Sequence, residues 1–224
     1  MNSARLFLVA VVLVLSSQLV SAQDLSRYRA YALHSSLDSV LAASGAREAD
    51  TRVLHERPAM IQELEWRAPY ARSANELVDP VRGIIFSFCD DALYQVLVSY
   101  DRDRTDGLSN SDIVDSLTAV YGTPVLGSAR NRPLEAPPDT VVLAQWDSAG
   151  SSLTLLRGVH SAEFQLILTA KALSTRARGA VREAARLDTA DAPRRELEQR
   201  KKEAADATAA RDKMRATNKA AFRP

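Results

Sequence analysis

The amino-acid composition of this 224-residue chain changes abruptly near residue 170. Residues 23–169 contain almost all of the aromatic and β-branched residues and carry a net charge of −7. The stretch from Ala170 to Pro224 is rich in Ala, Arg, Glu and Lys, and its net charge is +7. Only the first stretch has enough apolar residues for a core, and a body of its length can bury about two-thirds of its unfolded surface. We therefore predict a folded body over 23–169 and a basic, partly frayed helical tail over 170–224.

The overall composition, 46% hydrophobic and 25% charged, is that of a globular protein and excludes collagen-like and fully disordered classes. Cys89 is the single cysteine, so the chain cannot form an internal disulfide. It lies in the apolar run GIIFSFCDD, where the role of a small buried hydrophobic residue is favoured over that of a nucleophile.

The first 22 residues have the three parts of a secretory signal peptide. Arg5 supplies the positive end, Leu6 to Leu15 are all apolar, and Val20-Ser21-Ala22 offers a small-residue cleavage site. As a helix the apolar run would be about 15 Å long, roughly half of a bilayer core, so it is too short for a permanent anchor. We predict a mature chain that starts at Gln23 and is periplasmic or secreted. An uncleaved, buried helix is the alternative.

The body begins with an alternating aromatic stretch, Arg27 to Leu33, which predicts a strand. A short helix should follow, because Ser35 or Ser36 can serve as its N-cap and Gly45 can end it. Its apolar residues, Leu37, Val40 and Leu41, fall on one face.

Three further strands are predicted before residue 101. The segment Met60 to Pro69 alternates between apolar and polar residues, which is typical of a strand with one solvated face. The apolar runs Val81 to Phe88 and Ala92 to Tyr100 are separated by Asp90-Asp91, which indicates a β-hairpin.

A second helix should begin after Ser109, because Ser109 and Asp112 have the spacing of a capping box. Gly122 would end this helix, and Pro124 cannot continue it. Three strands are predicted after it, over 140–146, 151–158 and 162–170.

These elements predict an α+β fold, with two short helices on one face of an antiparallel sheet and a C-terminal helical extension. The order of strands and helices also allows two pseudo-repeats of the type β-α-β-β(-β), over 23–91 and 92–169. Each half has a capped helix, a glycine, an Arg-Pro pair and a strand that ends in tryptophan. Chance agreement of these common residues is the alternative to a duplication.

The second half contains LTAVYGTP, then a strand ending in Trp146, then two more strands. In this it resembles small exported bacterial modules of unknown function that have a helix, a Tyr-Gly-x-Pro exit and a following β-hairpin. The resemblance covers about residues 92–170. It implies a similar helix and hairpin here, and it carries no activity or site residues with it.

The tail begins with strong helix formers, and Leu173, Ala180 and Leu187 recur every seven residues. This stripe could pack on the body or form a homodimer with a second copy. Asp191 and Pro193 should break the helix, and a second, solvated helix should run from Arg194 to about Ala220.

Two interpretations of the tail stay open. It can act as a solubilising helix, or its positive charge can attract an anionic envelope polymer, a membrane surface or a protein partner. We predict no nucleic-acid partner, because acidic residues are interspersed with the basic ones. We also predict no transmembrane anchor after removal of the signal peptide.

No catalytic residue can be named from the sequence. None of the common nucleophile, dinucleotide, phosphate-loop or zinc-protease motifs occurs. His34, His55 and His160 lie in three separate predicted elements. We therefore predict neither a cofactor nor a catalytic site.

Metal binding is not predicted either, although the segment DRDRTDGLSNSD comes near to a calcium loop. Its candidate ligands are Asp101, Asp103, Asp106 and Asp112. The register of an EF-hand fails, because the glycine is one position late and two arginines lie among the acids. A connecting loop between a strand and a helix is the favoured interpretation.

Aromatic residues offer the best candidates for ligand contacts, since flat rings suit sugars and peptides. The candidates are Trp66, Trp146, Tyr31 and Tyr70. The alternative for each is a place in the core or at a sheet edge. The sequence therefore favours an exported, soluble, non-catalytic protein that binds an unknown protein or envelope polymer. The alternative is a hydrolase or metal-assisted enzyme with a cleft between the two halves.

Overall fold

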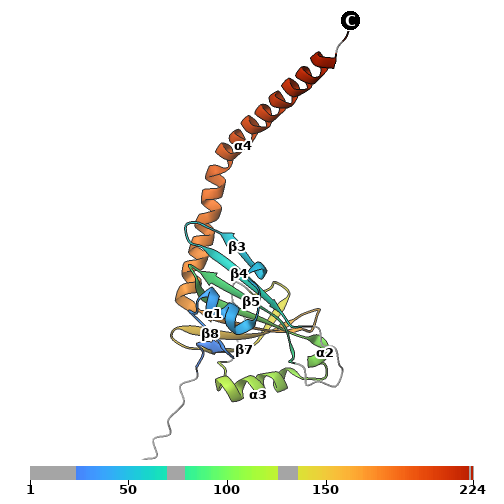
Figure 1. The fold of residues 1–224 in the computed structure, drawn as a ribbon. Coiled ribbons are helices and arrows are strands. Elements are labelled where there is room, and N and C mark those ends of the chain that lie inside the picture. Colours follow the sequence, from blue (N-terminus) through green and yellow to red (C-terminus); the bar gives the residue numbers. More distant parts are fainter. Residues whose placement is uncertain (1–23, 70–78, 126–135, 222, 224) are drawn as a thin grey trace, which may run out of the picture.

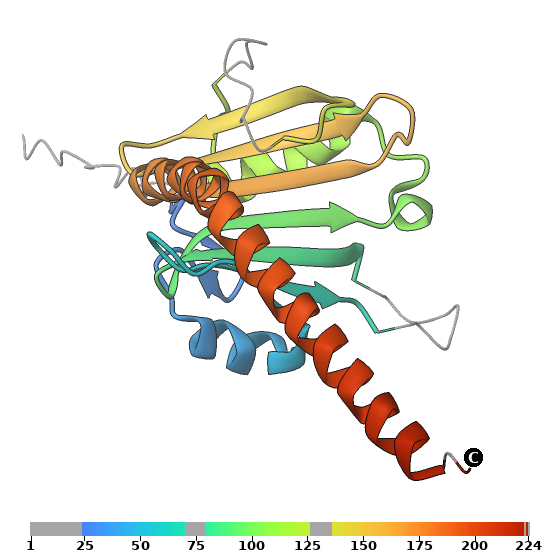
Figure 2. The same ribbon diagram turned by 90° about the horizontal axis from the view of Figure 1, so that it is seen from above.

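A computed structural model describes residues 24–69, 79–125, 136–221 and 223. The predicted signal peptide and Tyr70 lie outside the described residues. A seven-stranded antiparallel sheet forms the body, in the order β3-β4-β5-β6-β9-β8-β7 (Figures 1 and 2). Its strands are β3 (Thr51–His55), β4 (Ile61–Arg67), β5 (Val81–Cys89), β6 (Ala92–Tyr100), β7 (Thr140–Asp147), β8 (Ser151–Gly158) and β9 (Phe164–Ala170). The predicted α+β fold is confirmed.

The predicted hairpin between β5 and β6 turns at Asp90 and Asp91. Both residues have positive φ angles, 48° and 64°, as a two-residue type I′ turn requires. Their side chains also bind neighbouring segments. The Asp90 carboxylate accepts a hydrogen bond from the main-chain N–H of Met60 at 2.9 Å, and that of Asp91 accepts one from Leu37 at 2.8 Å. The hairpin turn therefore holds the start of β4 and the start of the first helix.

Two capped helices lie on one face of the sheet, as predicted. Helix α1 (Leu37–Ser44) has Ser36 as N-cap, and Gly45 ends it in the left-handed conformation. Helix α3 (Asn110–Tyr121) begins with the capping box of Ser109 and Asp112. The apolar sides of both helices pack on the same core cluster.

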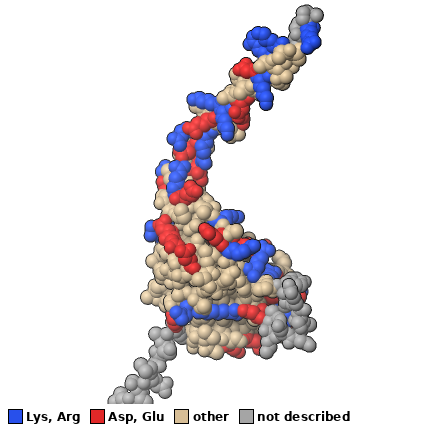
Figure 3. Space-filling model, viewed as in Figure 1, with Lys and Arg blue, Asp and Glu red and all other residues tan. Residues whose placement is uncertain are grey.

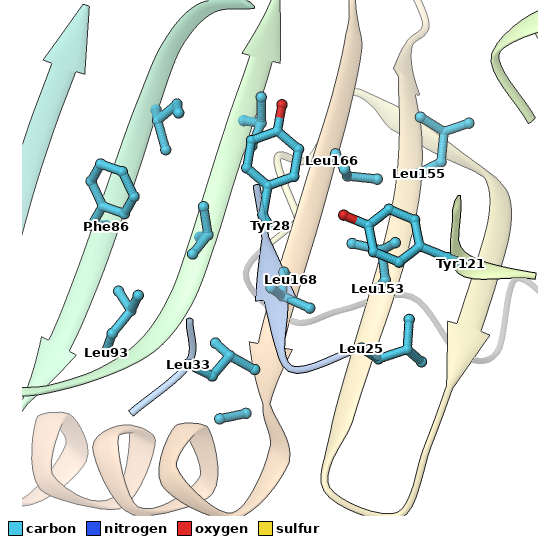
Figure 4. Packing of buried hydrophobic residues seen from close by; sticks show 14 of the residues in the cluster. Leu25, Tyr28, Leu33, Phe86, Leu93, Tyr121, Leu153, Leu155, Leu166 and Leu168 are labelled. Carbon is cyan, nitrogen blue, oxygen red and sulfur yellow. The ribbon is translucent and has the colours of Figure 1, made fainter. Parts of the chain in front are cut away.

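That core is formed mainly by alternate residues of the central strands, such as Phe86, Leu155 and Leu166. The segment before α1 covers part of it with Leu25 and Tyr28, which are almost fully buried (Figure 4). Burying a side chain of this size stabilises the fold by about 1.5–3 kcal/mol.

This N-terminal segment differs from the expected strand over 27–33. It forms two strands of two residues each, β1 (Arg27–Tyr28) and β2 (Tyr31–Ala32), which pair with each other and not with the large sheet. Arg29 turns the chain between them with a φ of 54° and forms an ion pair with Asp79. Alternation alone does not show that a chain reverses after two residues.

Helix α4 (Lys171–Ala221) continues directly from β9 and packs on the opposite face of the sheet (Figures 1 and 2). Its buried residues are small, namely Ser174, Ala177, Ala180 and Ala184. Ala177 and Ala180 form a cluster with Ile61 and Cys89, against which Leu173 also packs. Two residues of the predicted stripe thus contact the body, whereas Leu187 is half-buried. A homodimer through this stripe stays a prediction.

The expected break at Asp191 and Pro193 is wrong, because α4 continues through both residues. A proline inside a helix removes one hydrogen bond and its ring presses on the preceding turn, which usually bends the helix. The axis of α4 does change direction along its length (Figure 1). The Asp188 carbonyl near this bend accepts a hydrogen bond from the Arg195 side chain at 2.9 Å.

Two short elements were not expected. Strand β3 is an edge strand with mostly exposed side chains, so it has no apolar alternation to reveal it. A one-turn helix, α2 (Arg102–Thr105), forms where a loop was favoured, and the Asp101 side chain caps it. No helix in the described ranges combines the length and hydrophobicity that a membrane span requires.

Candidate functional site

An open cleft lies where β4 extends beyond its edge neighbour β3. Pairing between these strands ends at Thr51 and Leu64, but β4 continues to Arg67. The cleft has a volume of about 710 Å³. It is lined by the end of α1, the following turn and the end of β4, through Ser44, Gly45, Ala46, Arg47, Ala49, Asp50, Glu65, Trp66, Arg67 and Pro69.

The main chain of β4 presents unpaired polar groups at this edge. The N–H of Ala68 donates to the Arg82 carbonyl of β5 at 3.0 Å. Hydrogen-bonded residues alternate along an antiparallel strand, so Trp66 also directs its main-chain groups to β5. Those of Glu65 and Arg67 therefore point the other way, toward the cleft. No described residue pairs with these two on that side.

The neighbouring turn explains why this edge is free. Continued pairing would place Asp50 opposite Glu65, but Glu48–Asp50 forms a short 3₁₀ helix instead. The Asp50 carboxylate accepts hydrogen bonds from the main chain and side chain of Arg47, which close this turn. The 3₁₀ helix therefore leaves room beside β4 that a longer β3 would fill.

Trp66 provides the apolar wall of the cleft. Its side chain is half-buried and packs against the main core, while part of it remains exposed to the cleft. The indole N–H has no hydrogen-bond partner among the described residues. A flat ring next to free main-chain donors and acceptors is suited to an extended, partly apolar ligand.

The charged residues around the cleft neutralise one another. Arg47 pairs with Asp50 at 2.8 Å, and Arg67 pairs with Glu65 at 2.7 Å. The hydrogen bonds that Arg47 donates to the Asp50 carboxylate hold the pKa of Asp50 below its ordinary value and raise the pKa of Arg47. Each ion pair combines one positive and one negative side chain, so the cleft as a whole does not select a strongly charged ligand.

Chemistry at this cleft is limited by its side chains. The one hydroxyl among the lining residues, that of Ser44, donates weakly to the Leu41 carbonyl at 3.4 Å and accepts from Ala46 at 3.2 Å. Neither histidine nor cysteine lines the cleft. The lining therefore provides contacts for binding, and no nucleophile with an adjacent base.

The structure separates the other aromatic candidates from this cleft. Trp146 is only 1% exposed, and its indole N–H donates to the Gly122 carbonyl at 2.6 Å. The Tyr31 ring packs edge-on against Phe86 with ring centroids 4.6 Å apart. Both thus take part in the packing of the body, and Tyr70 lies outside the described residues.

Buried tyrosines form a second polar cluster, under the turn between β1 and β2. Burial raises the pKa of Tyr28 and of Tyr100, and the neighbouring Tyr100 phenol raises that of Tyr28 further. Burial also raises the pKa of Tyr121 to about 12. These phenols are neutral at physiological pH, so they act as packing and hydrogen-bonding groups.

The remaining polar candidates do not converge. His55 lines a smaller cleft of about 250 Å³ between the end of β3 and α4, which neither His34 nor His160 lines. The carboxylates of Asp101 and Asp112 cap α2 and α3. Within the described ranges, no three His, Cys, Asp or Glu side chains are grouped so that they could hold a metal ion. Cys89 is buried, and burial raises its pKa.

No protein-family model, curated protein or solved structure matches this chain. The resemblance of residues 92–170 to small exported modules therefore stays a prediction. The free edge of β4 was not foreseen in the sequence, because it depends on where β3 ends. Trp66 was the one signal in the sequence that pointed to it.

Proposed function

We propose that this protein is an exported, non-catalytic binding protein whose body holds an extended peptide segment at the free edge of β4. The observation that carries the proposal is that the main-chain groups of Glu65 and Arg67 beside Trp66 pair with no other described residue on the cleft side. An extended peptide can complete such an edge by adding a strand, with its own main chain supplying the hydrogen bonds.

The cleft also defines the chemistry of the peptide. Main-chain pairing provides affinity without regard to sequence, and the exposed part of Trp66 favours an apolar or flat side chain at the central position. The balanced ion pairs of Arg47 with Asp50 and of Arg67 with Glu65 favour a peptide of low net charge. Only two or three residues are covered, so we expect weak binding of a short segment.

The predicted leader supports the periplasmic or extracellular part of the proposal. Cleavage after Ala22 would give a mature chain that begins with Gln23. Mass spectrometry of the protein from a periplasmic or culture-medium fraction tests this. A chain that retains its first 22 residues in a cytosolic fraction would overturn the export proposal and leave the cleft unaffected.

The peptide proposal can be tested by selecting extended peptides from a displayed library on the full chain. Arg67→Pro removes the N–H that faces the cleft. The ladder with β5 keeps its hydrogen bonds, because Arg67 lies opposite Gly83 as a non-hydrogen-bonded pair. Arg67→Ala removes the same side chain but retains the N–H, so it is the matched control.

Selected peptides should bind the wild type and Arg67→Ala with similar affinity, and Arg67→Pro about tenfold more weakly or worse, as expected for one lost hydrogen bond of about 1–1.5 kcal/mol. Urea denaturation of both variants shows whether the fold is retained. Equal binding to a folded Arg67→Pro variant, or a failure to select any peptide, would refute strand addition at this edge.

A further inference from the structure

The second half of α4 has no contact that buries it. All side chains from Ala192 to Ala220 that the structure describes are exposed. Between Arg194 and Ala221 there are nine basic and five acidic residues. Figure 3 shows this part of the helix projecting from the body, with blue and red side chains along it. A helix that is polar all round needs interactions beyond apolar packing to stay ordered.

The continuity of α4 places the basic residues in a line. Starting at Arg194, positions spaced by three or four residues share one face of a helix. These eight positions hold Arg194, Leu197, Lys201, Ala204, Thr208, Arg211, Arg215 and Lys219, and we call them the basic stripe. Five of the eight are basic and none is acidic. Two of the five acidic residues of the segment, Glu198 and Asp212, lie beside the stripe, one turn from two of its members each, and the other three lie on other faces of the helix.

The charges of the basic stripe are poorly neutralised within the chain. Arg194 has only a long contact with Glu198, at 3.9 Å. Lys201, Arg211, Arg215 and Lys219 have no ion pair with any described residue. By contrast, Arg200 and Arg195, which lie off the stripe, pair with Glu196 and Asp188.

Three of these residues also repel one another. Arg211, Arg215 and Lys219 follow at intervals of four, so each has a like charge one turn away. Such pairs disfavour the helix in isolation, and an anion beside them would remove the penalty. An arrangement that conflicts with a local rule in this way is typical of a binding surface.

We propose that the basic stripe binds a linear polyanion, a polymer that carries phosphate or carboxylate groups at regular intervals. The stripe from Arg194 to Lys219 is about 37 Å long, so several anionic groups of one extended polymer could align with it. The proposal is independent of the peptide cleft, because the stripe lies on the part of α4 that extends away from the body.

Two other occupants fit the stripe less well. An amphipathic helix that lies in a bilayer needs an apolar face, but residues 194–221 of α4 include only Leu197 and Met214 as large apolar residues. A second copy of the chain in a coiled coil would bring the unpaired cations of both copies together. A polyanion needs charge complementarity alone.

Calorimetric titration of the full chain with long-chain inorganic polyphosphate, over a series of salt concentrations, tests the proposal. The variant Lys201→Gln/Lys219→Gln removes two charges from the stripe. Its matched control, Lys202→Gln/Lys213→Gln, removes two equally exposed lysines of the same helix that lie off the stripe. Both variants have the same composition and net charge.

We expect the stripe variant to bind polyphosphate about tenfold more weakly or worse. The slope of log K against log salt concentration should become shallower by about two for this variant. The control should retain the wild-type values within about twofold.

Three results would overturn the proposal. The first is an absence of polyphosphate binding by the wild type. The second is an equal loss in both variants, which would show that net charge alone matters. The third is tighter binding to vesicles of phosphatidylglycerol and phosphatidylcholine than to polyphosphate, which would indicate a membrane surface instead.

Discussion

The two tryptophans allow the same substitution to be compared in the core and in the cleft. Trp146→Phe removes the indole N–H that donates to the Gly122 carbonyl, at a position that is 1% exposed. This hydrogen bond is part-buried, and a carbonyl left there without its donor costs about 1–3 kcal/mol. The smaller ring also loses contacts with its neighbours, among them Tyr121 at a ring distance of 6.5 Å, for about 1 kcal/mol more. We expect a total loss of about 2–4 kcal/mol.

Trp66→Phe is the matched control, because Trp66 is half-buried and its indole N–H has no partner among the described residues. It should cost less than about 1 kcal/mol. With a urea m-value of about 2 kcal/mol/M, the midpoint should fall by about 1–2 M for Trp146→Phe and by less than about 0.5 M for Trp66→Phe. Each variant retains one tryptophan, so fluorescence can follow both transitions.

An equal loss in the two variants would refute the assignment of Trp146 to the core and of Trp66 to an open cleft. So would a loss below about 1 kcal/mol for Trp146→Phe, since the hydrogen bond to Gly122 would then contribute little. A change in the m-value would show that the substitution altered the denatured or native state as a whole.

Three further predictions concern the ion pair under the N-terminal turn, the bend in α4 and a helix cap. Hydrogen bonds from Arg29 hold the pKa of Asp79 below its ordinary value of 3.8, so the pair stabilises the fold above about pH 4 and stops doing so as the pH falls through the lowered pKa. The difference in urea midpoint between wild type and Asp79→Asn should therefore shrink from pH 7 to pH 3, and a constant difference would contradict this. Pro193→Ala should increase the helix signal in circular dichroism and leave the urea midpoint of the body unchanged, because the surrounding turns are exposed; a lower midpoint would show that the bend supports the body. Ser36→Ala should lower the free energy of unfolding by about 1 kcal/mol through loss of the α1 cap, whereas Ser36→Asn, which keeps a capping side chain, should change it by less than about 0.5 kcal/mol; similar effects would exclude capping as the cause.

The elements that the sequence predicts well are those specified by neighbouring residues. Asp90 and Asp91 can form a two-residue turn whatever the rest of the chain does, and the capping box of Ser109 and Asp112 is closed within one helical turn. Such signals depend on local hydrogen bonds and φ angles. They fix most element boundaries, and with them the α+β class.

The candidate site depends on tertiary structure and could be predicted only in part. Trp66 and Trp146 each end a predicted strand, yet one lines a cleft and the other is buried beneath α3. What separates them is the point at which β3 stops pairing and the position of Gly122, and neither is encoded near the tryptophan itself. The main-chain groups of β4 that face the cleft likewise depend on where β3 stops pairing, so the residues around them do not reveal them.

Pro193 does not end the helix as expected, and the reason is energetic. The penalty of about 3 kcal/mol for a proline inside a helix is strictly local. It ends a helix only where the following residues gain less by staying helical than the proline costs. Here residues 194–221 follow in the same helix, many of them strong helix formers, so the helix persists with a bend.

The opposite charges of body and tail would draw the basic stripe onto the acidic body if the tail were flexible, since unlike charges attract over about 10 Å at moderate salt. The structure opposes this in two ways. Ion pairs of Lys171 with Asp147 and of Arg176 with Asp90 fix the first turns of α4 on the sheet, and the Arg57–Asp191 pair holds the helix just before its bend. The helix beyond is stiff, so it cannot fold back over its own length. The body thereby uses the acidic residues nearest to α4 to fix its direction, and the cations of the basic stripe remain available to another molecule.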